Sequence, residues 1–353
     1  LPIFEVQNAY LFILGDYAKV NYHEDITNSS PLEETGSGLL ANDVSGTPTA
    51  GDILLEPSRD RIQVVLRFNE LSWVPIISSS HPLGVIFGGT ENGTVVFIDA
   101  HKFVNDGALS VISSRRDHHG HVLSVDYSVD NRWAISAGGA AQLLLWDLTN
   151  LTTPFTPGNP NFADQVKRVR WNRSVDNIVV SLSSHRGSLW DMRRPGGPIL
   201  EFAEFGSGCD WADICWKPGD SSTLIVGSQL ALTPGIQKWD LRYPTAPVNE
   251  FHLHDRGVTA MDWHRNDPRM VVSAGNDGFV RVFNPDTGEV HGCLQLQRND
   301  KVRALTWSEV RPDLFAIQYF QHPTEFRSIE AGCEPRAFYS KHAGEDEGKP
   351  PPN

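Results

Sequence analysis

Short runs that alternate apolar and polar residues recur along the middle of the chain, and most of them end on a large aromatic residue. One class of run closes on Trp73, Tyr127, Trp171, Trp216, Trp263 and Trp307. A second class closes on the dipeptide Trp-Asp, at Trp146-Asp147, Trp190-Asp191 and Trp239-Asp240. Alternation with a period of two is typical of strands that bury one face. Both classes recur in step at intervals of about 45 residues, which predicts a repeated unit of short strands.

This interval and the closing dipeptide together are the signature of WD repeats, in which each repeat forms one four-stranded blade of a β-propeller. Seven such units would fill most of the 353 residues, so we predict an all-β fold, a seven-bladed WD-repeat β-propeller. Residues 1–330 are predicted to form this propeller as a single domain. Its last blade is expected to be degenerate, because no clear Trp-Asp strand follows Ile317.

Two segments lack the alternating pattern. Residues 21–50 are rich in Gly, Ser, Asn and Pro and are predicted to form a long loop. Residues 331–353 close with an acidic and proline-rich run and are predicted to be a disordered tail. The first blade is expected to take a strand at residues 10–14 and its outer strand at residues 52–56. The second blade is then expected to begin near Val64.

Polar residues recur at fixed places within the repeats. A buried indole N–H needs a hydrogen-bond partner, and WD-repeat families supply it through a relay of Ser or Thr, His and a turn Asp. The third unit lacks the turn Asp, and the sixth has Phe283 in place of the Trp. We therefore predict partial polar networks, with stability that depends mainly on apolar packing. The predicted structural positions are His118, Ser136, Trp146, Asp147, Trp190, Asp191, Trp239, Asp240, His254, Ser273 and Asp277.

Composition narrows the class of protein. The formal net charge of −13 and the pI near 5.4, without a dense Lys/Arg run, argue against nucleic acid as the main ligand. The four cysteines, at positions 209, 215, 293 and 333, do not have the spacing of a disulfide framework or a zinc site. No signal peptide follows Leu1, and no apolar run approaches the roughly 20 residues of a membrane span. We expect a soluble protein from a reducing compartment, and the missing initiator Met suggests a fragment of a longer protein.

Three local patterns could carry chemistry, but each has a structural explanation. His118-His119-Gly120-His121 could hold a metal, yet no Cys or acidic partner has ligand spacing. Ser183-Ser184-His185 lacks the setting of a catalytic nucleophile. The Gly-Gly pairs at 88–89 and 138–139 lack the helix that would cradle a phosphate. We therefore predict no catalytic residue, no metal, no cofactor and no enzymatic activity.

The order of individual segments resembles one family, the larger subunit of the COPII vesicle outer coat. The resemblance covers about residues 64–312 and departs from the family pattern at 21–50 and after Ile317. The most specific match is Thr-Pro-Phe-Thr-Pro-Gly at 153–158, since common propellers do not carry it after a Trp-Asp strand. The segments that carry the resemblance are residues 88–93, 147–158, 171–173, 190–193, 237–242 and 283–290.

This resemblance implies a non-enzymatic scaffold that assembles the coat cage on vesicles for transport from the endoplasmic reticulum to the Golgi. The implied partners are the small propeller subunit of the outer coat and other coat propellers at the cage vertices. Contacts with the inner coat and its GTPase are implied only for downstream regions that are not in this sequence. No nucleic acid is implied. The implied location is cytoplasmic, peripheral on COPII vesicles and endoplasmic reticulum exit sites, with only peripheral membrane association.

Two other classes of function are weighed against the coat. A nuclear WD-repeat adaptor could capture a basic peptide, such as a histone tail, in an acidic central mouth, and the net charge permits this. A ring of Asp and Glu side chains that converge on one face would favour that alternative. A propeller enzyme would instead need a cluster of acid, base or metal-binding groups in the channel.

Overall fold

The structure is a computed structural model that describes most of the chain between residues 52 and 328. The described ranges are 52–55, 64–75, 81–106, 110–151, 153–157, 164–194, 196–203, 209–230, 235–296, 301–308, 314–320 and 324–328. Within these ranges the regular structure is antiparallel β-sheet apart from a short helix, α2 (Ala100–Asp106). None of the described residues belongs to a helix with the length and apolar character that a membrane span needs.

The strands form successive sheets in chain order. The first sheet holds β1 (Asp52–Leu55), β2 (Val64–Val74), β3 (Val85–Thr90), β4 (Val95–Asp99) and β5 (Val111–Arg115), and the second holds β6 (Val122–Tyr127), β7 (Trp133–Gly138) and β8 (Gln142–Asp147). The third holds β9 (Arg168–Trp171), β10 (Ile178–Leu182), β11 (Arg186–Asp191) and β12 (Leu200–Ala203). The fourth holds β13 (Trp211–Trp216), β14 (Thr223–Ser228), β15 (Ile236–Asp240) and β16 (Asn249–Phe251). The fifth holds β17 (Val258–Trp263), β18 (Val271–Gly275), β19 (Phe279–Phe283) and β20 (Val290–Gln295), and the sixth holds β21 (Val302–Trp307), β22 (Leu314–Tyr319) and β23 (Glu325–Ser328).

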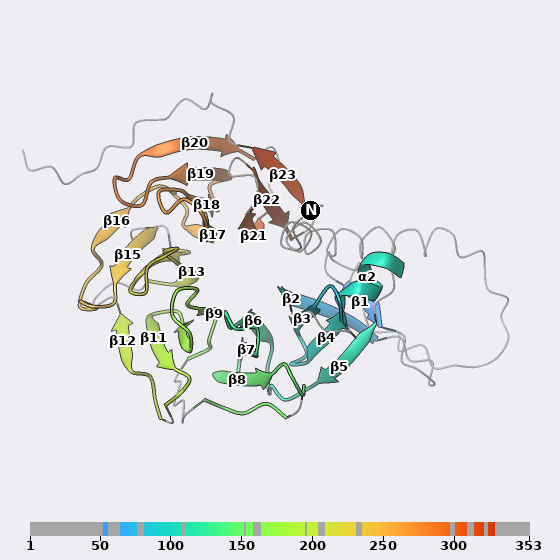
Figure 1. Ribbon diagram of the computed structural model, residues 1–353. Helices are drawn as coiled ribbons and strands as arrows, with labels where there is room; N and C mark the ends of the chain where they lie inside the picture. Colours follow the sequence, from blue (N-terminus) through green and yellow to red (C-terminus); the bar gives the residue numbers. More distant parts are fainter. Residues whose placement is uncertain are drawn as a thin grey trace, which may run out of the picture.

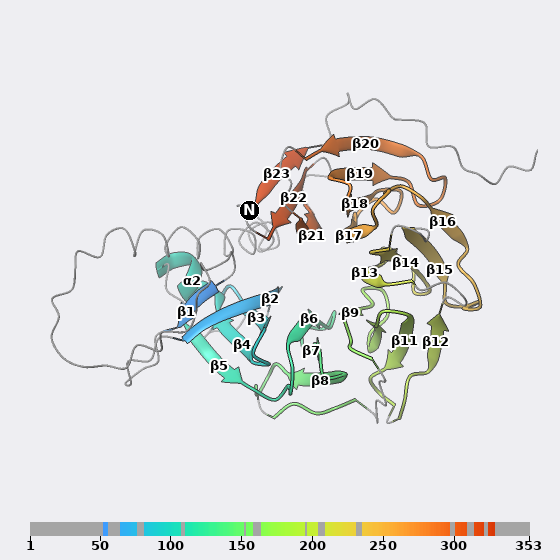
Figure 2. The same ribbon diagram turned by 180° about the vertical axis from the view of Figure 1, so that it is seen from behind.

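The six sheets follow one another around a common axis, as the two opposite views show (Figures 1 and 2). The innermost strands β2, β6, β9, β13, β17 and β21 surround the centre, and later strands of each sheet lie progressively further out. Consecutive sheets pack face to face from the first to the sixth, because a single small sheet cannot bury both of its apolar faces. This arrangement confirms the predicted all-β propeller and the positions of most of its strands.

The prediction of seven blades was wrong, because the strands of the described residues form six sheets. Residues 52–56 were expected to complete a first blade of their own. Instead, β1 pairs with the beginning of β2, with Asp52 opposite Arg67 and Leu55 opposite Val64. The 11-residue β2 is long enough to pair with β1 at its start and with β3 from Phe68 to Val74. One five-stranded sheet therefore stands where two blades were expected. Residues 10–14, 21–50 and 331–353 lie outside the described part.

Among the described residues the second sheet has no regular fourth strand, and Pro157 explains why. Phe155 forms a single antiparallel bridge with Leu145, with N–H···O distances of 2.8 and 3.0 Å in the two directions. Continuing this register would place Pro157 opposite Leu143. Proline has no backbone N–H, so it cannot extend the ladder. The described residues 153–157 thus add one bridge to β8.

Apolar clusters join each described pair of consecutive sheets except one. In the joint between the third and fourth sheets, Trp239 lies against Phe202 and Trp211, with ring centroids 5.1 and 6.0 Å away. Gly187 allows Phe202 to approach, since a Cβ there would lie 2.1 Å from its ring. Similar clusters span the first and second, second and third, fourth and fifth, and fifth and sixth sheets. The remaining apolar cluster of the described residues belongs to the first sheet and α2 alone.

The contact between the sixth and first sheets is made differently. The Arg303 guanidinium, at the start of β21, donates from Nη2 to the backbone carbonyls of Phe68 and Asn69 on β2, the second over 3.0 Å. The same guanidinium lies over the ring of Phe320, 5.6 Å from its centroid. A charged side chain on main-chain oxygens therefore bridges the two ends of the ring in the part of the chain that is described.

Candidate functional site: the polar relays and the charged lining of the ring

His118, Ser136 and Trp146 form a buried chain of hydrogen bonds in the second sheet. The Trp146 indole Nε1 donates to Ser136 Oγ over 2.8 Å, and His118 Nε2 lies 2.7 Å from the same oxygen. Because the indole can only donate, the serine hydroxyl is left to donate its own hydrogen to the imidazole. Burial lowers the pKa of His118 to about 4, which keeps the ring neutral.

The third and fourth sheets show two reduced forms of this relay. In the third sheet the Trp190 indole donates to Ser181 Oγ over 2.9 Å, and Ser181 occupies the same place as Ser136. In the fourth sheet Val226 takes that place, so the fully buried Trp239 indole has no hydrogen-bond partner among the described residues. Trp239 is therefore held by apolar packing.

His254, Ser273 and Asp277 come together in the fifth sheet, where Phe283 replaces the tryptophan. His254 Nε2 lies 2.8 Å from Ser273 Oγ, and its Nδ1 lies 3.0 Å from Asp277 Oδ1. Buried Arg281 places Nη1 2.8 Å from Asp277 Oδ2 and 2.8 Å from His254 Nδ1. Burial works against the charge of Asp277, but its bonds to His254 and Arg281 outweigh burial and hold the pKa of its carboxyl at about 2. Arg281 thus adds a cation to the relay of serine, histidine and aspartate, which the repeat pattern defines without a cation.

The Asp residues of the Trp-Asp pairs lie at the ends of their strands and organise the turns that follow. Their Oδ1 atoms accept backbone hydrogen bonds two residues on, an arrangement that suits tight turns. The donors are Thr149 N to Asp147 at 2.9 Å, Arg193 N to Asp191 at 3.1 Å, and Arg242 N to Asp240 at 3.0 Å. In the third and fourth sheets the arginine side chain also folds back onto the same carboxylate.

A second set of carboxylates joins neighbouring innermost strands around the axis. Each accepts a hydrogen bond from a backbone N–H of the next sheet, which ties the strands together without sheet pairing. The pairs are Val125 N to Glu70 Oε2 at 2.8 Å, Trp171 N to Asp126 Oδ2 at 2.6 Å, Met261 N to Asp213 Oδ2 at 2.9 Å, and Trp307 N to Asp262 Oδ2 at 2.7 Å. Ser124 Oγ plays the same part for Val169 N at 3.1 Å.

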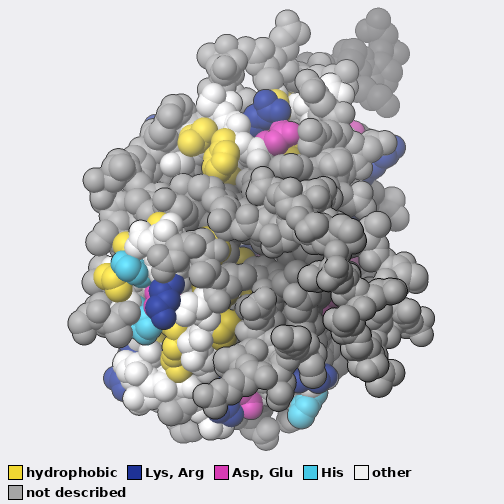
Figure 3. All heavy atoms as spheres, turned by 90° about the vertical axis from the view of Figure 1, so that its right-hand side faces the viewer, with side chains coloured by type: hydrophobic (Ala, Val, Ile, Leu, Met, Phe, Trp, Pro, Cys, Tyr) yellow, Lys and Arg dark blue, Asp and Glu magenta, His cyan; other side chains and the backbone are white. Residues whose placement is uncertain are grey.

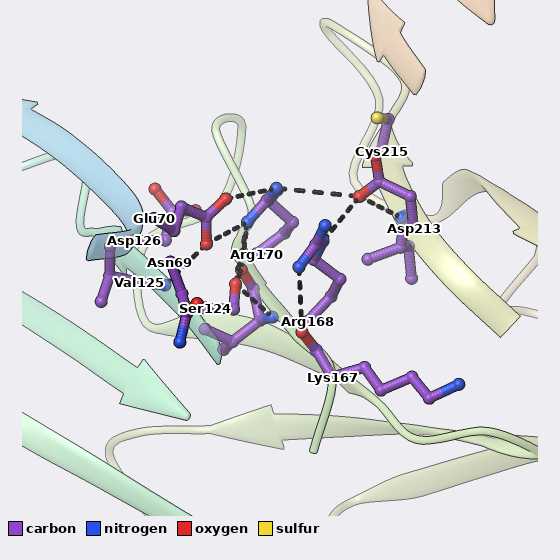
Figure 4. Close-up of polar contacts among 12 residues, drawn as sticks. Asn69, Glu70, Ser124, Val125, Asp126, Lys167, Arg168, Arg170, Asp213 and Cys215 are labelled. Atoms are coloured by element: carbon purple, nitrogen blue, oxygen red, sulfur yellow. Dashed lines mark hydrogen bonds and ion pairs between the residues drawn. The ribbon is translucent and has the colours of Figure 1, made fainter. Parts of the chain in front are cut away.

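Two arginines of β9 complete this lining, as the close-up shows (Figure 4). Arg170 Nη2 lies 2.9 Å from Glu70 Oε1, and it also lies 3.7 Å from Asp213 Oδ1 on the other side. Arg168 Nε lies 3.3 Å from the same Asp213 oxygen. From its place in the third sheet, Arg170 thereby contacts both Glu70 of the first sheet and Asp213 of the fourth.

The electrostatics of this lining favour ion pairs. Burial disfavours the charge of Glu70, but Arg170 and Arg168 outweigh burial and hold the pKa of its carboxyl below the usual value. Burial likewise disfavours the charge of Arg170, yet the surrounding carboxylates outweigh it and raise its pKa. Asp262 has no arginine in hydrogen-bond contact among the described residues, and burial raises its pKa to about 6.

This geometry excludes an acidic mouth built from the described inner strands. The carboxylates are bonded to backbone N–H groups of the next sheet, and arginines neutralise Glu70 and Asp213. On the flank of the ring that carries α2, the visible described Lys, Arg and His side chains are interspersed with apolar ones (Figure 3). The described inner strands therefore do not offer the uniform charge that would attract a basic peptide or nucleic acid.

The other sequence patterns lie in turns and strands. His119 and His121 are exposed beside the buried His118, and no group of three or more possible metal ligands occurs among the residues with described positions. Ser183 Oγ donates to the Arg186 carbonyl over 3.1 Å within a turn. Gly88 is packed under the side chains of Leu71 and Phe68, and Gly138 lies against the His121 carbonyl. These glycines allow close packing of strands.

Sequence reasoning missed three functional groups of the framework. Ser181 could have been found, because it stands nine residues before Trp190 as Ser136 stands ten before Trp146. The Arg170–Glu70 pair joins residues 100 positions apart, so no local pattern reveals it. Arg281 stands within the otherwise apolar strand β19, and only the fold shows its contact with Asp277.

Comparison with known proteins relates the chain to WD-repeat proteins. The family model "WD domain, G-beta repeat" matches residues 109–147 and 245–284. The first range covers β5 and the second sheet, and the second range covers most of the fifth sheet.

Two curated relatives match over most of this chain. "Protein transport protein Sec31A" of Danio rerio is 30% identical over 324 residues, which are 88% of this chain and 25% of the relative. The protein of the same name from Mus musculus is 31% identical over 272 residues, which are 75% of this chain and 22% of the relative. The chain thus spans about a quarter of the length of these relatives.

A solved structure shows the same fold. The structure "COPII on membranes, outer coat vertex" matches with a TM-score of 0.69 and 22% identity, over 87% of this chain and 82% of the matched chain. At this level of identity the likeness concerns the fold of the ring.

Proposed function

The chain is a WD-repeat propeller homologous to the Sec31 protein transport proteins, and we propose from this premise that it is a scaffold of the COPII outer coat. The single observation that carries the proposal is the similarity to Sec31A over 88% of the chain, which extends through nearly all of the sheets. The likeness in fold to an outer coat vertex supports the same role. In this role the protein binds other proteins and catalyses no reaction.

The mechanism is geometric. Side-chain links between inner strands and apolar clusters between sheets hold the loops of the ring in fixed relative positions. A rigid platform loses little conformational entropy when it binds. Each loop contact can be a small, transient interface. Many copies assembled on one membrane raise the effective concentration of every contact, so the lattice is stable although a single contact is weak.

The finer assignment concerns partners and location. The propeller contacts other coat propellers at cage vertices, and it works beside the small propeller subunit of the outer coat. Contacts with the inner coat and its GTPase belong to regions beyond this sequence. The protein is cytoplasmic and peripheral on COPII vesicles and endoplasmic reticulum exit sites. Residues 1–330 act as one propeller unit in this scheme. The likeness in fold to a chain of the outer coat vertex and the similarity to Sec31A support these assignments.

A competition experiment tests the vertex role. Purified residues 1–353 are added in excess to a cage assembly reaction that contains the complete outer coat. Occupied vertex contacts should reduce the number of closed cages seen by electron microscopy. An unrelated WD-repeat propeller of similar size is the control. Undiminished cage formation at an excess that saturates binding would contradict the vertex role.

A capture experiment tests the partner. The propeller with its native downstream sequence should recover the small propeller subunit of the outer coat from cytosol. Recovery of histones instead would support the nuclear adaptor. No described feature favours that alternative, because the inner carboxylates are engaged within the ring.

A further inference from the structure

Three arginines occupy equivalent settings at one end of the ring. We call Arg193, Arg242 and Arg269 the arginine rim. Arg193 and Arg242 follow the third strands β11 and β15, and Arg269 lies between the first two strands of the fifth sheet. First and third strands of an antiparallel sheet run in the same direction, so these turns share one end of their sheets. Neighbouring inner strands also run in the same direction, since Lys167, Arg168 and Arg170 contact Asp210, Asp213 and Trp216 in the same order.

Each rim arginine is held by the aspartate two residues before it, in a common geometry. Nε and Nη2 donate side-on to the two carboxylate oxygens. The Nε and Nη2 distances are 2.9 and 2.8 Å for Arg193 on Asp191, 2.9 and 2.6 Å for Arg242 on Asp240, and 3.0 and 3.0 Å for Arg269 on Asp267. Two of these aspartates belong to the Trp-Asp pairs, so the repeat itself positions the cations.

The two partners of each pair differ strongly in exposure. The arginine side chains are 64%, 68% and 71% exposed, whereas their aspartates are 6%, 15% and 26% exposed. The carboxylates therefore lie underneath and the guanidinium groups face solvent. A chain with a formal net charge of −13 thus presents ordered cations at this end of its third to fifth sheets.

One edge of each rim guanidinium keeps N–H donors that make no hydrogen bond among the described residues. A guanidinium has five N–H donors in a planar fork. The side-on pair uses Nε and one Nη2 hydrogen, and Nη1 of all three arginines has no hydrogen bond within the described part of the protein. The end formed by Nη1 and the second Nη2 hydrogen matches another planar carboxylate. Because the aspartate already fixes the group, less side-chain entropy is lost when that carboxylate binds.

Apolar groups lie in the same turns. Tyr243 directly follows Arg242 and is 73% exposed, and Ile199 and Val248 are exposed further along the loops after β11 and β15. Arginine and tyrosine are among the residue types that are enriched at the binding hot spots of protein interfaces. We propose that the arginine rim binds an acidic, extended segment of a partner protein, whose carboxylates meet the guanidinium ends and whose apolar side chain packs on Tyr243.

A protein segment fits this surface better than a lipid bilayer. The cations are separate, each paired with its own aspartate, and exposed apolar side chains lie between them along the chain. Alternating acidic and apolar residues match this alternation. The overall negative charge of the protein also opposes approach to an anionic membrane.

The test uses a fluorescent peptide of about 12 residues, which spans roughly 40 Å when extended, with Asp and Glu around one Phe. Binding to residues 1–353 is followed by anisotropy at low ionic strength. The triple variant Arg193→Gln, Arg242→Gln, Arg269→Gln should weaken binding about tenfold or more, and Tyr243→Ala should weaken it severalfold. Added salt should weaken the wild-type complex, since the contacts are exposed ion pairs.

The matched control is Arg186→Gln. Arg186 is 58% exposed and is paired with Glu201, but it stands at the opposite end of β11. This variant should bind the peptide as the wild type does. Thermal melting of every variant verifies that the ring is folded.

Equal weakening by Arg186→Gln, or no saturable binding to the wild type, would overturn the proposal. So would binding of phosphatidylserine vesicles, lost in the triple variant, without binding of the peptide. The proposal goes beyond the coat assignment and is separable from it. Peptide binding can fail while the propeller still competes for cage vertices, and the reverse outcome is equally measurable.

Discussion

The second and fifth sheets carry the same histidine and serine of the repeat, but they stabilise them in different ways. In the second sheet an indole completes the relay, and no acidic side chain is hydrogen-bonded to His118 among the described residues. In the fifth sheet Phe283 removes the indole, and Asp277 with Arg281 supplies a buried ion pair beside His254. The comparison teaches that both sheets keep a large buried aromatic side chain at this position, while the polar groups beside it can be neutral or charged.

The largest effect is expected from Trp146→Ala in the second sheet. Trp146 is fully buried against Phe97 of the first sheet, with ring centroids 5.7 Å apart. Its removal leaves a cavity and deprives Ser136 of a donor, so the free energy of unfolding should fall by about 4 kcal/mol. Chemical denaturation measures this change. A loss below about 1 kcal/mol would contradict the buried position of the indole between the first and second sheets.

Asp277→Asn should be nearly as costly in the fifth sheet. The substitution leaves the buried Arg281 guanidinium without its counter-charge, and breaking a buried ion pair in this way costs about 3 kcal/mol. The double variant Asp277→Asn, Arg281→Leu should recover part of that loss, because the unpaired cation is gone. If the double variant is the less stable of the two, the charge pair is not the cause.

The pH dependence of stability reports on both sheets, because burial lowers the pKa of His254 in the fifth sheet as it lowers that of His118 in the second. Burial lowers the folded-state pKa of His118 from 6.5 to about 4, so the unfolded chain binds the extra proton in this window. Stability from this group is therefore complete above pH 6.5 and falls as the pH drops towards 4. At about 1.4 kcal/mol per pKa unit, the loss at pH 5 should be about 2 kcal/mol.

Comparing wild type with His118→Gln isolates this contribution. The variant should lose less stability between pH 6.5 and 5. Asp277 titrates in another window, because its folded-state pKa of about 2 lies below the ordinary value of 3.8. Its contribution is complete above pH 4 and disappears as the pH falls from 4 to 2. Identical curves for wild type and His118→Gln would show that His118 is not held neutral.

The smallest effect sharpens the comparison. Trp146→Phe makes the second sheet resemble the fifth at this position, and it removes one indole hydrogen bond worth about 1 kcal/mol. Trp239→Phe is the matched control, since it removes the same volume from a buried indole that has no hydrogen-bond partner in the described part. The difference between the two losses of unfolding free energy measures the hydrogen bond. A difference near zero would mean that Ser136 gains another donor.

The sequence predicted the repeated features of the fold and failed where contacts cross the ring. The alternation located strands such as β13 to β15 and β17 to β19, because local burial alone produces that pattern. The predicted number of blades was wrong because residues 52–55 pair with the start of β2 and do not complete a blade of their own. Nothing in the sequence of a four-residue strand specifies which strand it pairs with.

The candidate sites show the same division. His118 with Ser136 and Trp146, and His254 with Ser273 and Asp277, occupy repeat positions that the sequence marks. Glu70 and Arg170 depend on how two distant inner strands lie beside each other, which no local pattern encodes. The arginine rim stands between these cases, since Asp-x-Arg is visible in the sequence while its exposure requires the fold.

The link from Arg303 to the carbonyls of Phe68 and Asn69 has a mechanical consequence. The other joints of the described ring combine a dry apolar cluster with polar links, whereas this joint has the guanidinium clasp without such a cluster among the described residues. As far as the described residues determine it, tension along the circumference should part β21 from β2 more easily than it separates the other neighbours. High salt should weaken this contact, because it depends on a charged side chain.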